Sequence, residues 1–552
     1  MVEISDIKKE IKKYRYVYMA VFFIFIVGVF LRAYNFGDYL ILKSDQARDA
    51  LIINQAKLNG ISSLPLVGPQ IGGTELKLGP VFYYFQFISG KIFGFSPESL
   101  AYPDLIFGIL TIFLVFLLAR KFFVLKISIF LTALSSVSLF LVTFSRFGWN
   151  PNSLPFFTFL FAYSFLTAIE KKGRNKWIFL FLTGLSLGII AQLHLFAILP
   201  LSLGLILFLI ITKSLNYKEI IFLISIILFL HTPLIINEIR TDGENIKSFY
   251  QAKEKKEARD NKHKIYELFF RSYQENSRAM WISLTGNQNP DIISTKGTKI
   301  VCNQECKDNL LYSLVAMVFF GFSLAVIFCS WIKSNDLVEK KRMLFIILWI
   351  VGFIIFSALF AYQLEIRFYL GIIPLFILLG GFDLKYILTV GKKIYLRYLV
   401  WTICFFIVFL NFYATFAYLK DLSDSRFSNK KGGDDLRFEN DSKVTLGQLR
   451  DIAQEADLRL DKENFLIISG ETHYVKAMYY LLSVEYGFRG CYLRGDKYDI
   501  DPVFNQLIIY YNKNDDNHSE KTEKKFGTLK ASFIKSELPA KNLKVPEGCI
   551  NY

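Results

Sequence analysis

The chain has 552 residues, of which 53% are hydrophobic and 17% are aromatic, and its mean hydropathy is +0.35. A water-soluble domain of this length carries a smaller apolar fraction, so the composition excludes an ordinary soluble enzyme. The formal net charge of +16 does not require nucleic acid, because Lys and Arg gather in the cytoplasmic loops of membrane proteins. We therefore expect an integral membrane protein with no nucleic-acid partner.

Eleven apolar segments are each close to the length that crosses a ~30 Å hydrocarbon core, and they predict an all-α polytopic membrane bundle. The first segment follows a basic stretch and shows no small-residue cleavage site, so we expect an uncleaved span with a cytoplasmic N-terminus. A further candidate, Gly79–Gly94, contains Gln86 and Lys91 and is expected to lie in the membrane interface. The eleven segments are 16–36, 101–119, 127–145, 153–169, 177–192, 195–212, 219–236, 310–332, 343–361, 368–388 and 398–418.

The basic clusters between the segments decide the topology. If Gly79–Gly94 does not cross, all of these clusters face the cytoplasm, as the short loops of membrane proteins prefer. If it crossed, all of them would lie outside. The topology with the C-terminus outside is therefore favoured. The clusters are Arg120–Lys126, Lys171–Lys176, Lys213–Lys218, Lys333–Arg342 and Lys385–Arg397.

This topology brings the unusual polar residues at the segment ends to the same, non-cytoplasmic face. An ionisable group at membrane depth costs roughly 3 kcal/mol or more, so such groups usually line a cavity or pair with each other. Any one of them could be an interfacial anchor, but carboxylates and cations together on one face indicate a site. The residues are Asp45, Asp49, Glu75, Lys77, Arg146, Asn150, His194, Glu238, Glu365 and Arg367.

The membrane domain is expected to span residues 1–419 and to carry two large external loops, 37–100 and 237–309. The first loop contains SDQARDALIINQ at positions 44–55. Surface helices are predicted there at Ala47–Leu58 and at Gly79–Gly94. The second loop contains a charged helical stretch that could cover a cavity.

Residues 420–552 are expected to form a small extracytoplasmic α/β domain. Thr445 and Gln448 make a capping-box pattern at the start of TLGQLRDIAQEADLRL, which predicts a helix. Strands are predicted at 464–469 and 506–511, with a helix at 472–486 between them.

The cysteines fit this topology. Cys302, Cys306, Cys491 and Cys549 fall outside, and this even number is compatible with disulfides Cys302–Cys306 and Cys491–Cys549 in an oxidising compartment. A zinc site at CNQEC would lack a second pair of ligands.

The sequence contains no P-loop, GxSxG, HExxH or dinucleotide-binding fingerprint, so a soluble nucleotide is not the expected energy source. An external enzyme needs an activated donor that reaches it through the membrane, such as a polyprenyl-phosphate sugar. Its transfer requires a carboxylate that deprotonates the acceptor and cations that stabilise the phosphate leaving group. Asp45 is the candidate base, with Asp49 beside it. Candidate phosphate-binding residues are Lys77, Arg146 and Arg367.

Several stretches resemble the GT-C glycosyltransferases of family 39, the dolichyl-phosphate-mannose–protein mannosyltransferases and their bacterial relatives, which include lipid A aminoarabinose transferases. The resemblance begins with SDQARDALIINQAKLNGISSLPLVGP and GGTELKLGPVFYYF in the first external loop. Similar stretches follow in the order and spacing of the prokaryotic branch: FSRFGWNPNSLPFF at 144–157, GLSLGIIAQLHLFAILPL at 184–201, TPLIINEIR at 232–240, LEIRFYLGIIP at 364–374 and TLGQLRDIA in the tail.

The resemblance implies a GT-C membrane bundle with a lipid-facing groove and an inverting transfer from a lipid-phosphate sugar. It implies that Asp45 is the general base and that Lys77 and Arg367 lie near the donor phosphate. Further cavity-lining residues are expected to be Arg48, Glu75, Tyr83, Asn150, His194 and Glu365. The implied partners are a polyprenyl-phosphate sugar and an acceptor protein, lipid or glycan in the cell (inner) membrane of a prokaryote.

Two positions depart from the mannosyltransferase pattern: Gln46 replaces Glu, and Asp49 replaces Tyr. Mannose and a protein hydroxyl are therefore not assured as substrates. No cofactor is required, although Asp45 and Asp49 could together hold a divalent cation. Asp49 could equally pair with Arg48. An oligosaccharide ligase or polymerase, a lipid-linked-sugar transporter or flippase, and a non-catalytic scaffold remain alternatives.

Overall fold

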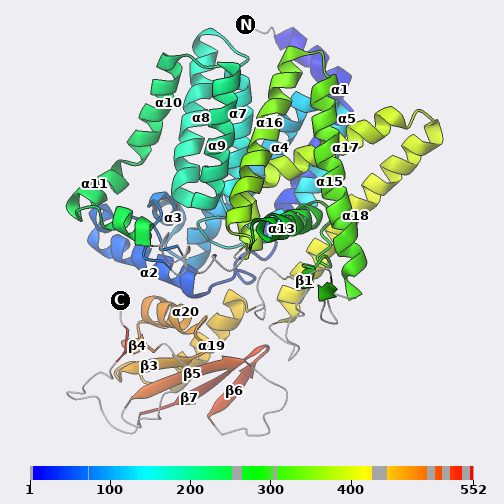
Figure 1. The fold of residues 1–552 in the computed structure, drawn as a ribbon. Coiled ribbons are helices and arrows are strands. Elements are labelled where there is room, and N and C mark those ends of the chain that lie inside the picture. Colours follow the sequence, from blue (N-terminus) through cyan, green and yellow to red (C-terminus); the bar gives the residue numbers. More distant parts are fainter. Residues whose placement is uncertain are drawn as a thin grey trace.

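The computed structural model describes residues 4–71, 74–251, 264–296, 299–301, 308–362, 364–425, 444–493, 504–511, 522–536 and 548–550. It consists of a long helical bundle with a small α/β unit at one end (Figure 1). The N-terminal end of the first helix lies at the other end of the bundle.

The described residues form eight helices that are long and apolar enough to cross a membrane. One further pair, α10 and α11, passes the same test together but bends by 58°, and two shorter apolar helices are α5 and α7. These helices coincide with all of the predicted apolar segments, so the predicted polytopic α-bundle is confirmed. The long helices are α1 (Ile4–Ala33), α4 (Pro97–Phe122), α8 (Gly173–Leu193), α9 (Leu195–Thr212), α15 (Leu310–Lys333), α16 (Leu337–Leu359), α17 (Ile373–Val390, continuous with the 3₁₀ helix η2, Ile366–Ile372) and α18 (Ile394–Asp424). The others are α5 (Leu125–Val137), α6 (Leu139–Thr143), α7 (Leu154–Ala168), α10 (Tyr217–Leu230) and α11 (Thr232–Arg240).

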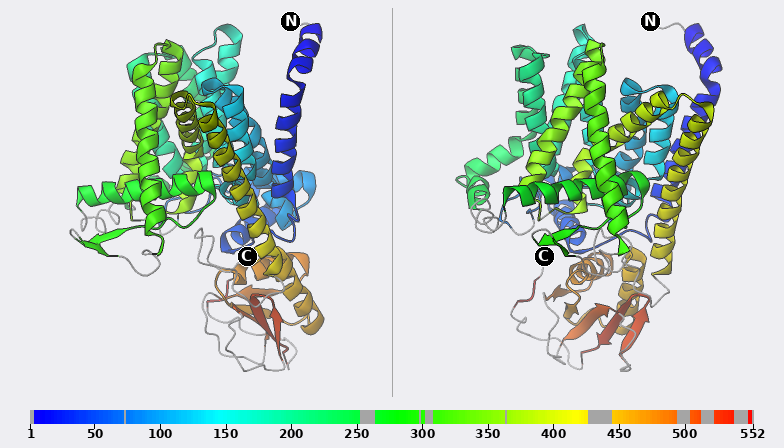
Figure 2. Two further views of the ribbon diagram at one scale, coloured as in Figure 1. Left: turned by 90° about the vertical axis from the view of Figure 1, so that its right-hand side faces the viewer. Right: turned by 45° about the vertical axis from the view of Figure 1, so that its right-hand side comes forward.

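Three helices outside this set lie at the end of the bundle that faces the α/β unit. They are α2 (Ser44–Asn59), α3 (Val81–Phe93) and α13 (Ile265–Thr285). α13 lies across the bundle end in both views of Figure 2. α2 and α3 correspond to the two surface helices predicted in the first external loop, and α3, with 13 residues, is too short to span a ~30 Å hydrocarbon core.

The opposite end of the bundle carries the basic inter-helix clusters. There, the Glu170 carboxylate forms ion pairs with Lys121 Nζ at 3.0 Å and with Arg342 Nε at 2.7 Å. These contacts join the last turn of α4, the turn after α7 and the start of α16, and partial burial makes such a network more stabilising than an isolated surface pair.

The C-terminal unit has a five-stranded sheet with strand order β4-β3-β5-β7-β6. β3 is parallel to both β4 and β5, whereas β7 is antiparallel to β5 and β6. Helices α19 (Leu446–Arg459) and α20 (Val475–Tyr480) lie between the sheet and the bundle. The strands are β3 (Leu466–Gly470), β4 (Gly490–Tyr492), β5 (Asn505–Tyr511), β6 (Glu523–Phe526) and β7 (Leu529–Ile534). A separate hairpin pairs β1 (Ser294–Lys296) with β2 (Lys299–Val301).

The predicted α/β character of this unit is confirmed. The backbone N–H of Thr445 donates to Gln448 Oε1 at 3.0 Å, and the Gln448 N–H donates to Thr445 Oγ1 at 3.4 Å, which is the predicted capping box. β4, β6 and β7 were not predicted. The expected boundary at residue 420 falls inside α18, which continues to Asp424.

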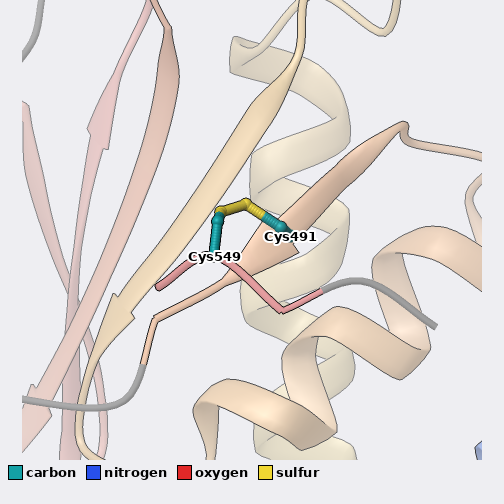
Figure 3. Close-up of a disulfide and its surroundings, with 2 residues drawn as sticks. All are labelled: Cys491 and Cys549. Atoms are coloured by element: carbon teal, nitrogen blue, oxygen red, sulfur yellow. A yellow bond between two sulfur atoms is a disulfide. The ribbon is translucent and has the colours of Figure 1, made fainter. Parts of the chain in front are cut away.

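A disulfide joins Cys491 of β4 to Cys549 near the C-terminus, with their Cα atoms 5.6 Å apart (Figure 3). It is the second of the two predicted disulfides. The first, Cys302–Cys306, lies outside the described residues.

Candidate functional site

The start of α2 carries a compact charge network. Arg48 Nη1 lies 2.9 Å from Asp45 Oδ1, and Arg48 Nη2 lies 2.7 Å from Asp49 Oδ1. The Asp49 side chain is completely buried, whereas 51% of the Asp45 side chain is exposed. One guanidinium group therefore holds a buried and an accessible carboxylate together.

Burial controls the protonation of this network. It raises the pKa of Asp49 to about 6, although the neighbouring Arg48 opposes the rise. Tyr83 of α3 lies against the same pair, and its own burial, together with the charge of Asp49, raises the pKa of its phenol. At neutral pH, Asp49 is thus predominantly ionised and fixes Arg48, and Asp45 is the accessible carboxylate of the network.

Local sequence explains why α2 begins at this point. The Gln46 side chain accepts a hydrogen bond from the backbone N–H of Lys43 at 3.1 Å, so this N–H, just before the first turn of α2, has a hydrogen-bond acceptor. The buried face of α2 includes Ala47, Ala50 and Ile53, and it fixes the helix against its neighbours. Gln46, a departure from the mannosyltransferase pattern, therefore has a structural function in this chain.

A second polar cluster surrounds η2. Arg367 pairs with Glu365 at 2.8 Å, and its guanidinium carbon lies 5.0 Å from the centre of the Trp149 ring. The His194 ring lies 5.3 Å from the ring of Phe368. Burial and the positive charge of Arg367 lower the pKa of His194 to about 3, so this imidazole is neutral and acts as a hydrogen-bonding group.

His194 separates α8 from α9, and its position there is a consequence of capping. Its Nδ1 accepts a hydrogen bond from the backbone N–H of Phe196 at 3.2 Å, at the start of α9. Asn150 Nδ2 donates to the carbonyl of Leu193 at 2.8 Å, directly before this histidine. The predicted residues His194, Asn150 and Arg367 therefore belong to one connected group.

The Lys77–Gly79 segment joins the same region. The backbone of Lys77 donates to and accepts from the Asn245 side chain, at 2.7 and 3.0 Å, and the Gly79 N–H donates to the carbonyl of Gln192 at 3.1 Å. The Lys77 ammonium has no ion pair within the part of the chain that the structure describes, and the side chain is half-buried. Glu75 is exposed and accepts a hydrogen bond from Gln70.

Arg146 is the predicted phosphate-binding residue that the structure places elsewhere. Its guanidinium donates to the carbonyls of Leu31, Arg32 and Tyr34, at 3.0, 2.7 and 2.7 Å, and only 1% of the residue is exposed. These carbonyls belong to the C-terminal end of α1, where backbone acceptors lack intrahelical partners. Arg146 therefore caps the first helix, and the prediction that it binds phosphate does not fit this geometry.

α13 overlaps the charged helical stretch predicted around Gln251–Trp281 in the second loop, but sequence reasoning did not single out the ion-paired residues on it. Glu275 is buried and pairs with Arg271 at 3.1 Å and with Arg278 at 3.6 Å. Burial raises the pKa of Glu275, and the two arginines oppose this shift. Tyr369 of η2 interacts electrostatically with the same group, so the cluster adjoins the element that carries Arg367. The i, i+4 and i+3 spacing of these charges was the available signal.

The two carboxylates of α2 do not fit the divalent cation that the sequence left open. Arg48 occupies the space between Asp45 and Asp49 and binds both, so a cation there would have to displace a buried ion pair. Among the described residues, no three or more His, Cys, Asp or Glu side chains form a group that could hold a metal ion.

The family comparison agrees with this architecture. A family model described as dolichyl-phosphate-mannose-protein mannosyltransferase matches residues 77–236, a range that contains Lys77, Tyr83, Asn150 and His194. No curated protein matches the sequence significantly. The matched range is less than a third of the chain, so over these residues the chain is similar to that family.

Solved structures with this fold include two distant relatives. ArnT from Cupriavidus metallidurans in the apo state is 12% identical, with a TM-score of 0.55, and the alignment covers 96% of this chain and 100% of that one. The same protein bound to undecaprenyl phosphate gives a TM-score of 0.50 at 11% identity, with the same coverage. The Archaeoglobus fulgidus oligosaccharyltransferase with Zn and sulfate gives 0.51 at 13% identity; the alignment covers 85% of this chain, which spans 62% of that protein.

Proposed function

We propose that this protein is a membrane glycosyltransferase that transfers a sugar from a polyprenyl-phosphate donor to an acceptor hydroxyl on a protein, lipid or glycan. The observation that carries the proposal is the Asp45–Arg48–Asp49 network, in which one accessible carboxylate is held by a buried ion pair. ArnT, which shares the fold, has been crystallised with undecaprenyl phosphate, and this supports a lipid-phosphate donor here.

In this proposal, Asp45 is the general base. Its carboxylate accepts the proton of the acceptor hydroxyl as that oxygen attacks the anomeric carbon of the sugar. The bond from that carbon to the phosphate oxygen breaks, and the polyprenyl phosphate leaves with the bonding electrons. A single displacement of this kind inverts the anomeric configuration. Asp49 and Arg48 are positioning residues, because they act on the substrate only through Asp45.

The leaving phosphate needs cationic groups in a site that excludes water. Lys77 is half-buried and its backbone is fixed by Asn245, and we assign its ammonium to the phosphate. Arg367 is held by Glu365 and Trp149, so its guanidinium has a fixed direction. Arg271 and Arg278 of the adjoining cluster are both held by Glu275 beside η2.

We place this site on the extracytoplasmic face of the cell membrane of a prokaryote. The Cys491–Cys549 disulfide supports that side, because disulfides persist in oxidising compartments and are rare in the cytosol. The basic clusters at the other end of the bundle support it independently, because short cytoplasmic loops are enriched in Lys and Arg.

The decisive experiment supplies the purified protein in lipid with a series of polyprenyl-phosphate sugars and measures which donor is consumed. Asp45→Asn is expected to reduce kcat by about 10²-fold or more, within the range attributed to general-base catalysis. Asp457→Asn is the matched control, since Asp457 pairs with Lys462 on the C-terminal unit and should leave transfer unchanged. Asp45→Asn activity within a few-fold of wild type would remove Asp45 from the mechanism.

The same assay separates the phosphate-binding residues. Lys77→Ala and Arg367→Ala are expected to raise the KM for the donor by about 10-fold or more, the loss of one charge-assisted hydrogen bond worth ~1.5–3 kcal/mol. An unchanged donor KM in both variants would contradict their assignment to the phosphate.

A further inference from the structure

The C-terminal unit holds the segment that leads into α2 by its backbone. The Leu446 N–H donates to the carbonyl of Leu40 at 2.7 Å, and the Gly447 N–H donates to the carbonyl of Asp38 at 3.1 Å. These donors lie in the first turn of α19, where N–H groups have no intrahelical partner. The membrane domain thus completes the capping of a helix in the C-terminal unit, and in return its 38–40 segment is fixed.

A second contact lies at the residue before the candidate base. The Ser44 hydroxyl donates to the carbonyls of Thr472 and His473, with oxygen separations of 2.9 and 3.2 Å. Both carbonyls belong to the loop that follows β3, the strand that lies between its two parallel neighbours. The first turn of α2 therefore touches the C-terminal unit directly next to Asp45.

The docking is reinforced around these contacts. Arg450 of α19 forms ion pairs with Glu98, in the first turn of α4, and with Glu485 of its own domain. α20 packs against α2, and the Tyr480 hydroxyl reaches the carbonyl of Phe95 at 3.5 Å. Ion pairs, a helix contact and backbone hydrogen bonds together fix the unit on the membrane domain.

We propose that the C-terminal unit positions the general base through Ser44, which makes Ser44 a positioning residue that acts through Asp45. The inference rests on the function proposed above, and it assigns the C-terminal unit a part in the chemical step. Within α2, Asp45 is held by Arg48. The preceding residue, Ser44, is held by the Thr472–His473 loop through its hydroxyl. A displacement of a reacting group by about 1 Å can cost on the order of 10² in rate, so the second contact bears on kcat.

The test compares Ser44→Ala with Ser44→Thr in the intact protein, using the donor and acceptor identified by the consumption assay. Ser44→Ala is expected to lower kcat by about 10-fold while the donor KM changes less than two-fold, because the phosphate-binding residues are untouched. Ser44→Thr keeps the hydroxyl and should restore most of kcat. Ser483→Ala is the matched control, since the Ser483 hydroxyl donates within its own helical segment, to the carbonyls of Tyr479 and Tyr480.

The outcomes separate this inference from the proposed function. If Asp45→Asn is inactive but Ser44→Ala matches wild type in kcat, the positioning role is wrong and the transferase assignment stands. If Asp45→Asn retains activity, the proposed base fails whatever Ser44 does. A loss of kcat in Ser44→Ala that Ser44→Thr does not restore would also overturn the inference, as would an equal loss in Ser483→Ala. Thermal melting in detergent checks that each variant is folded.

Discussion

The Asp49 side chain is fully buried and carries a negative charge. Folded proteins tolerate a buried charge only when a group of opposite charge or a set of hydrogen bonds compensates for it. The partner of Asp49 is Arg48, which also reaches the accessible Asp45. Burial nevertheless raises the pKa of Asp49 from 3.8 to about 6, so the ion pair does not fully compensate for desolvation. Ionisation of Asp49 therefore lowers the free energy of unfolding, by an amount that depends on pH.

This cost leads to a prediction for Asp49→Asn. A carboxyl whose folded-state pKa is raised binds its proton more tightly in the folded protein, so the contribution of Asp49 to the free energy of unfolding is greatest below pH 4 and falls as the pH rises to about 6. Two pKa units correspond to roughly 3 kcal/mol. Between pH 4 and 7, the Tm of the wild type should thus fall relative to that of Asp49→Asn, which lacks this titration. Melting curves in detergent at several pH values measure the difference, and parallel curves for the two proteins would contradict the role of Asp49.

At the scale of single elements, sequence predicted the features that depend on neighbouring residues better than those that depend on residues far apart in the chain. The capping box of α19 was predicted because Thr445 and Gln448 are three residues apart and satisfy each other. The hydrogen bonds of Arg146 to the end of α1 were not predicted, because its carbonyl partners lie 112 to 115 residues earlier. Backbone carbonyls are present in every residue, so no sequence pattern identifies them as partners. β4, with three residues, and the antiparallel β6–β7 pair were missed because only their neighbours in the sheet define them.

The segment that carries Lys77 depends on a close approach to α8. A Cβ atom added to Gly79 would lie 2.3 Å from Gln192 Cγ and 2.4 Å from Gln192 Cβ, distances that real side chains do not reach. Because Gln192 Cβ is fixed by its helix, the segment itself would have to move. Sequence alone did not indicate the helix that this segment approaches.

Gly79→Ala is therefore expected to displace Lys77 and to raise the donor KM by about 10-fold or more, with a stability loss of about 1–3 kcal/mol from overpacking. The double variant Gly79→Ala with Gln192→Gly removes the obstructing side chain and should recover part of the donor affinity. Steady-state kinetics of both variants test this. A Gly79→Ala protein with wild-type KM would show that the close approach does not position Lys77.

The whole molecule has two chemically different ends. The helices α2, α3 and α13 and the C-terminal unit lie at one end, and the N-terminal end of α1 lies at the other (Figures 1 and 2). The eleven apolar segments were predicted from composition because hydrocarbon thickness limits their length. The docking of the C-terminal unit on α2 was not predicted, because it depends on contacts between residues more than 400 positions apart, such as Ser44 with Thr472.

The orientation of the two ends in the cell can be tested with single introduced cysteines. Lys462→Cys lies on the surface of the C-terminal unit, and Lys172→Cys lies in an exposed loop at the opposite end. If the disulfide-bonded unit is extracytoplasmic, a membrane-impermeant maleimide added to intact cells should label the first variant well above the parent protein and the second only after permeabilisation. The parent protein, which retains Cys329 and Cys404 as free thiols, sets the background for both. The reverse pattern would place the candidate site in the cytoplasm, where nucleotide sugars are available, and would remove the physical reason for a lipid-linked donor.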